Sequence, residues 1–98
     1  MSAEHWIVGS ETDGALFKSL GEALRALGYQ LDSEWSGVAG SQDISHWELV
    51  GPGGSLVVES ETYAGLSVSG APELVSALKL EFQRVLPANT SYMDSSHK

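Results

Sequence analysis

The spacing of apolar residues changes twice along this chain, and these changes restrict the folds that it can adopt. In residues 15–28 apolar side chains recur every three or four residues, which predicts an amphipathic helix that ends at Gly28. Residues 29–69 instead alternate apolar and polar side chains, as half-buried strands do. Residues 72–86 return to helical spacing, with Pro72 where a first-turn proline is tolerated.

Turn-forming residues divide the alternating region into four strands, and another short apolar stretch precedes the first helix. The predicted strands are residues 5–8, 29–36, 44–50, 55–61 and 63–69. A loop is expected over residues 37–43, and the "GPGG" of residues 51–54 predicts a tight hairpin turn. The order β-α-β-β-β-β-α favours an α+β fold, a two-layer sandwich with both helices on one face of a mostly antiparallel sheet.

The length of the chain, 98 residues, provides for one small hydrophobic core. We expect a single α+β domain over residues 4–87, in which the first strand, helix and second strand form a right-handed βαβ crossover. Pro87 is expected to end the last helix, because proline cannot continue its hydrogen bonding. Residues 88–98 are polar and aperiodic, which predicts a flexible C-terminal tail.

The alternation assigns the strand residues to two faces of the sheet. The apolar set is expected to point at the helices: Leu31, Trp35, Trp47, Leu49, Leu56, Val58, Leu66 and Val68. The opposite face is expected to carry a set of mainly acidic residues that forms the predicted partner-binding site: Asp32, Glu34, His46, Glu48, Glu59, Glu61 and Tyr63. Tyr63, Trp35 and Val57 are candidate anchors for a partner.

The charge of the chain is strongly negative and unevenly distributed. The 13 Asp and Glu residues outnumber the 5 Lys and Arg residues, giving a formal net charge of −8 at pH 7. This charge argues against nucleic-acid partners and against anionic membrane surfaces. No Lys or Arg lies between Ala26 and Leu78, so the carboxylates of the predicted strands have no nearby cation. Proteins tolerate such like-charge crowding for solubility or for binding a basic partner.

The functional hypothesis that follows is a small, acidic, non-enzymatic protein-interaction module, a monomer or weak homodimer, that docks a basic protein through this sheet face. An inhibitor or immunity-type protein that blocks a nucleic-acid-binding enzyme would have this charge. The competing interpretation is that the acidic face only keeps the protein soluble. A different hypothesis is a small-ligand-binding module, with a pocket between sheet and helices lined by Trp6, Trp35, Trp47 and Phe82.

Catalytic and metal-binding patterns are weak in this sequence. His46 and Glu48 are two residues apart on one predicted strand and therefore share a face, but no nucleophile motif accompanies them. We expect no catalytic residues, no cofactor and no metal. The carboxylates around His46 are expected to raise the pKa of its imidazole, because they stabilise the charged form.

Two absences in the sequence bear on location. The chain has no cysteine, which excludes disulfides and zinc-thiolate sites. Its first residues, "MSAEHWIVGS", have neither the basic start nor the apolar run of a secretory signal, and no stretch has the length of a membrane span. We therefore expect a soluble, cytoplasmic protein.

Overall fold

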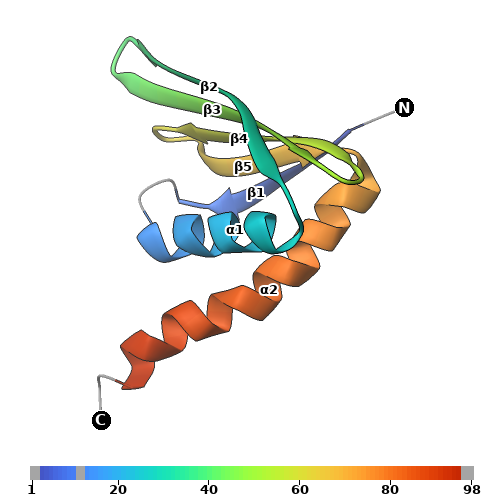
Figure 1. Cartoon of the computed structure of the whole chain (residues 1–98). Helices are drawn as coiled ribbons and strands as arrows, with labels where there is room; N and C mark the ends of the chain where they lie inside the picture. Colours follow the sequence, from blue (N-terminus) through green and yellow to red (C-terminus); the bar gives the residue numbers. More distant parts are fainter. Residues whose placement is uncertain (1–2, 11–12, 96–98) are drawn as a thin grey trace.

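Two helices lie against the same face of a five-stranded antiparallel sheet (Figure 1). The computed structural model describes residues 3–10 and 13–95, without the side chains of Ala39 and of residues 87–95. Its elements are β1 (Glu4–Gly9), α1 (Gly14–Ala26), β2 (Gln30–Ala39), β3 (Gln42–Gly51), β4 (Gly54–Glu61), β5 (Gly65–Gly70) and α2 (Pro72–Ser95). The predicted α+β class, the element order and the placement of both helices on one face are confirmed.

The strands lie in the order β1-β5-β4-β3-β2, and every neighbouring pair is antiparallel. Strands β2 to β5 follow one another as hairpins, and β1 completes the sheet beside β5. The connection through α1 therefore runs from one edge of the sheet to the other. Because four antiparallel pairings separate them, β1 and β2 run in the same direction, and the predicted βαβ crossover spans three intervening strands.

The ends of α1 follow from local hydrogen bonding and backbone conformation. The carboxylate of Asp13 accepts hydrogen bonds from the backbone N–H groups of Ala15 and Leu16, at 3.0 and 3.3 Å. These bonds satisfy two donors that the first turn of a helix leaves unpaired. The helix stops before Gly28, whose φ of 89° is accessible to glycine at little cost and is the stop that the sequence predicts.

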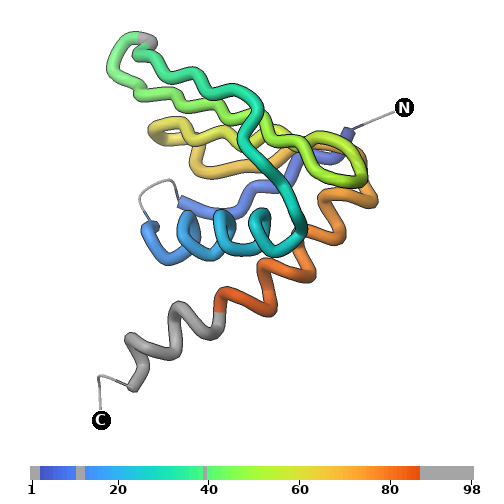
Figure 2. The backbone as a smooth tube through the Cα atoms, viewed as in Figure 1, coloured from blue at the N-terminus to red at the C-terminus, as the bar shows by residue number. Residues whose placement is uncertain are grey.

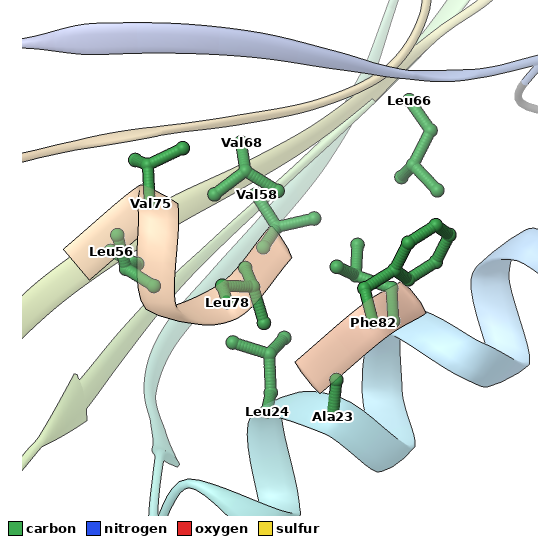
Figure 3. Packing of buried hydrophobic residues seen from close by; sticks show 10 residues of the cluster. Ala23, Leu24, Leu56, Val58, Leu66, Val68, Val75, Leu78 and Phe82 are labelled. Carbon is green, nitrogen blue, oxygen red and sulfur yellow. The ribbon is translucent and has the colours of Figure 1, made fainter. Parts of the chain in front are cut away.

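The core lies between the helices and two interior strands of the sheet, the central β4 and its neighbour β5 (Figure 3). Its buried apolar residues are Leu20, Ala23, Leu24, Leu56, Val58, Leu66, Val68, Val75, Leu78 and Phe82. Every second residue of β4 and β5 enters this layer, as the alternation predicts. Trp6 of β1 extends the core, with its ring edge-on to Phe82 and the ring centroids 5.3 Å apart.

The long helix α2 differs from the prediction at its end. It continues past Pro87 to Ser95 (Figure 1), so residues 88–95 of the predicted tail are helical, and residues 96–98 lie outside the described residues. Figure 2 shows α2 passing diagonally under the sheet, beside α1, over its coloured part. A proline inside a helix removes one hydrogen bond and crowds the carbonyl four residues earlier. That carbonyl belongs to Gln83, an exposed residue, so water can satisfy it. In the described part of the chain, neither helix has both the length and the apolar content that a membrane crossing requires.

The connection between β2 and β3 is shorter than the sequence predicts. Ala39 pairs with Gln42, so only Gly40 and Ser41 form the turn, and most of the expected loop belongs to the strands. Gly40 has a φ of 64°, which suits the glycine that tight hairpin turns favour. The "GPGG" segment is a hairpin turn as predicted, with Gly51 paired to Gly54.

Gly21, in the middle of α1, has no packing role in the fold. A Cβ atom built at this position would meet no heavy atom within 4 Å, so the glycine is not needed for close approach of helix and sheet. Glycine in a helix interior costs about 1 kcal/mol relative to alanine.

We therefore expect Gly21→Ala to raise the free energy of unfolding by about 0.5–1 kcal/mol, measured by urea denaturation. Gly65→Ala is the matched control. It should lower the free energy of unfolding, because Gly65 has a φ of 96° and a Cβ atom there would lie 2.6 Å from the carbonyl oxygen of Gly9. If the Gly21→Ala variant is no more stable than the natural chain, a Cβ atom at position 21 does not have the open space that the structure gives it.

A second prediction concerns the core face of α2. Leu78 is fully buried and Leu80, on the same helix, is 70% exposed. Leu78→Ala should lower the free energy of unfolding by about 2–5 kcal/mol, because it leaves a cavity in the core. Leu80→Ala should lower it by less than about 0.5 kcal/mol. Equal effects of the two substitutions in urea denaturation would show that α2 packs through a different face.

Candidate functional site

The face of the sheet that points away from α1 and α2, here called the outer face, carries two cross-strand rows of side chains. The pairing between strands defines both rows. From β1 to β2, one row is Ile7, Ser67, Glu59, His46 and Trp35, and the next is His5, Ser69, Val57, Glu48 and Ser33. The residues between them along each strand point to the helices and include the buried core residues.

His46 lies at the centre of the outer face between two carboxylates. Its Nδ1 atom is 3.1 Å from Oε2 of Glu59 on β4, and its Nε2 atom is 3.3 Å from Oε2 of Glu48 on β3. A neutral imidazole can donate through only one nitrogen, whereas the imidazolium donates through both. The two acceptors therefore favour the charged ring.

The pKa of His46 is raised above its ordinary value, as the sequence predicts. The hydrogen bond to Glu59 is the main cause, and Glu48 adds to it through a second hydrogen bond. Partial burial of the ring acts in the opposite direction, because it disfavours the charged form. His46, Glu48 and Glu59 are here called the His46 cluster.

Three more predicted site residues lie around this cluster. Glu61 follows Glu59 by two positions on β4 and shares its face. Tyr63 sits in the turn after β4, with 81% of its surface exposed and a φ of 74°. Asp32 is exposed on the edge strand β2, at the place where the pairing between β2 and β3 shifts.

This shift is a β-bulge between Leu31 and Ser33, and it reverses the predicted faces of the residues that follow it. Glu34, predicted on the acidic face, instead pairs with Trp47 on the helix side, where it accepts a 3.1 Å hydrogen bond from the indole Nε1–H. Trp35, predicted to face the helices, pairs with His46 on the outer face. One extra residue in an edge strand changes the side on which all later residues point.

The bulge leaves a tryptophan exposed beside the His46 cluster. Trp35 retains 57% of its surface exposed, and Ile7 at the other end of the same row retains 61%. The sequence contains a signal for Ile7, since a strand that buries Trp6 and Val8 must turn Ile7 outward. It contains none for Trp35, because the alternation of "LDSEWS" looks regular through the bulge.

The positive charges of the described residues gather on the helices. Lys79 of α2 donates to Glu4 at 3.0 Å, and Arg84 donates to Glu81 at 2.7 Å. Lys18 and Arg25 belong to α1. The strands contain no Lys or Arg, so the acidic outer face and the cation-bearing helices form opposite layers of the molecule.

A metal site or a catalytic centre would need a cluster of His, Asp or Glu side chains in a defined arrangement. Within residues 3–10 and 13–95, no three His, Asp or Glu side chains are arranged to hold a metal ion. On the outer face the Nδ1 atom of His5 lies 2.8 Å from the hydroxyl of Ser69. No carboxylate among the described residues is shown to orient His5 in the way that a Ser–His–Asp arrangement requires.

The His46 cluster generates a pH-dependent prediction. Because the folded-state pKa of His46 is raised, its ion pairs stabilise the fold fully below the unfolded pKa of about 6.5 and are lost as pH rises through the higher folded value. His46→Gln should therefore lower the free energy of unfolding by roughly 0.2–1 kcal/mol near pH 5.5 and by less near pH 8.5.

The measurement is urea denaturation at both pH values, with NMR titration of the His46 ring. In the titration, Glu59→Gln should lower the His46 pKa more than Glu48→Gln does, because the bond to Glu59 is the larger cause. A His46 pKa that neither substitution changes would show that the three side chains are not in contact.

The arrangement as a whole is an exposed acidic patch with a tryptophan beside it. Comparison of the chain with protein-family models finds no match, and none is found among curated proteins or among solved structures. The function is therefore inferred from the side chains of the outer face.

Proposed function

We propose that the protein is a non-enzymatic interaction module whose outer face docks a basic segment of a partner protein. The observation that carries the proposal is the exposed Trp35 beside the His46 cluster, on a face to which the described residues contribute no Lys or Arg. Such a surface offers one apolar anchor and several carboxylates in a single patch.

The charge of the patch favours a cationic partner. Glu48, Glu59 and Glu61 share the outer face, and His46 neutralises at most one of the three carboxylates when it is protonated. The remaining negative charge stands in a strongly acidic protein, so its field extends beyond the contact itself. Fields of this kind raise association rates by about 10- to 1000-fold and select against acidic partners.

The apolar residues of the patch provide contact area. Trp35 and Ile7 are both more than half exposed and lie at opposite ends of the row that contains Glu59 and His46. Exposed tryptophans are frequent among the residues that dominate binding energy, and carboxylates around them confer specificity. An arginine side chain of the partner can stack on Trp35 while its guanidinium pairs with a neighbouring carboxylate.

Tyr63, two residues after Glu61 in the chain, also favours partner binding at this end of the sheet. Its left-handed backbone conformation costs about 1–2 kcal/mol for a residue with a Cβ atom, and glycine or asparagine would adopt it more easily. A bulky aromatic residue, 81% exposed at such a position, contributes little to folding by burial.

The experiment compares two variants of equal net charge. The first changes Glu48, Glu59 and Glu61 to Gln on the outer face. The second changes Glu22, Glu34 and Glu73 to Gln, all of which lie elsewhere. Partners are captured from lysate at physiological salt and identified, and affinity for the purified partner is then measured by titration calorimetry.

We expect to capture a basic partner. Its dissociation constant should rise at least about tenfold with the outer-face variant, which equals about 1.4 kcal/mol of binding free energy. Trp35→Ala should raise it by a similar factor. The control variant should change it by less than about threefold, and added salt should weaken binding. Equal losses with the two charge variants would indicate a non-specific charge effect and contradict docking on this face. An enzyme that works on nucleic acid would be a partner of the expected charge class.

A further inference from the structure

A cavity separate from the outer face lies between α1 and the β2–β3 end of the sheet. It has a volume of about 150 Å³, and its walls include Phe17, Gly21 and Leu24 of α1, Leu31 of β2, and Trp47 and Leu49 of β3. Phe17 and Leu31 are 50% and 54% exposed, so the cavity opens to solvent where these two residues lie. Like the pocket hypothesised from the sequence, it lies between sheet and helices, but most of its lining residues differ.

Only Trp47 of the predicted pocket residues lines this cavity. Trp6 packs against Phe82 in the core, and Trp35 lies on the outer face. The sequence therefore predicts the layer in which the cavity forms, whereas its actual walls come from α1 and the edge of the sheet.

The walls of the cavity are apolar and aromatic. The rings of Phe17 and Trp47 have centroids 5.6 Å apart and planes inclined at 52°. The only polar atom of the indole, Nε1, donates to Glu34 at 3.1 Å, which fixes the ring and satisfies its donor. An occupant thus meets two aromatic rings and aliphatic side chains, with no polar group of Trp47 left to satisfy.

Gly21 contributes the space that makes this site. It lines the cavity, and an added Cβ would meet nothing within 4 Å, although glycine is unfavourable in a helix interior. A larger residue here would favour the helix and fill part of the cavity. The glycine therefore keeps open a space that neither helix formation nor packing requires.

The volume limits the size of the occupant. An enclosed apolar cavity of about 150 Å³ binds benzene in another protein, so a space of this volume admits a single ring. Nucleotides, sugars and long acyl chains exceed this volume or need polar partners that the walls lack. We propose that the cavity between α1 and β2–β3 binds a small uncharged aromatic compound of one ring, seated against the adjoining rings of Phe17 and Trp47.

The test uses toluene as the probe and the full-length chain. Toluene is titrated into ¹⁵N-labelled protein, and the signals of the Trp47 indole N–H and the Gly21 amide are followed by NMR. We expect saturable shifts at these two positions with a dissociation constant between about 0.1 and 1 mM. The indole N–H of Trp35, on the opposite face, should stay unchanged.

Two variants and a matched control sharpen the test. Gly21→Leu should fill the cavity and weaken toluene binding at least about tenfold. Gly14→Leu adds the same side chain to the same helix at a position that also has open space but does not line the cavity, and it should bind as the natural chain does. Phe17→Ala removes a half-exposed ring from the cavity wall and should weaken toluene binding several-fold. This variant tests the site without filling the cavity.

Three results would overturn the proposal. The first is absence of saturable shifts in a natural chain that is shown to be folded by its melting curve. The second is equal binding by Gly21→Leu and Gly14→Leu. The third is sedimentation as a dimer that toluene leaves intact and Phe17→Ala dissociates, because a second copy of the chain would then occupy the cavity. If no basic partner binds the outer face, the toluene measurements are unaffected, because the cavity and the outer face lie on opposite sides of the sheet.

Discussion

Two helices supply enough apolar surface to cover one face of a five-stranded sheet, and the rest of the structure depends on this constraint. Leu56, Val58, Leu66 and Val68 from the central strands meet α1 and α2, and each such side chain contributes about 1.5–3 kcal/mol by leaving water. The strands alternate, so burying these residues obliges their neighbours to face away from the helices. The outer face and its carboxylates are thus a consequence of the same pattern that builds the core.

The bulge in β2 decides the chemistry of both faces near the sheet edge. Without it, Glu34 would join the acidic face and Trp35 would turn toward the helices. With it, Trp35 stands exposed beside His46, and Glu34 holds the indole of Trp47 in the wall of the cavity. Edge strands tolerate such irregularities because they have a partner on one side only, and the bulge also makes the edge a poorer template for further pairing.

The proposed docking face and the proposed cavity share the two strands β2 and β3. Neighbouring residues alternate between them, with His46 on one side and Trp47 on the other. The two surfaces differ in chemistry: one is acidic and open, the other is apolar and recessed. This difference reflects the opposite environments of the two sheet faces, since one is lined by helices and the other meets water.

The sequence by itself determined α1, the start of α2, the order of the elements, the alternation of β4 and β5 and the absence of cations between Ala26 and Leu78. Each of these depends on residues close together in the chain. It also determined the direction of the His46 pKa shift, which needs only carboxylates on the same face. The tertiary structure decided that β1 joins β5, that β2 contains a bulge and that Gly21 borders a cavity. These features depend on how distant strands pair and pack, and a register shift of one residue leaves no mark in the local pattern.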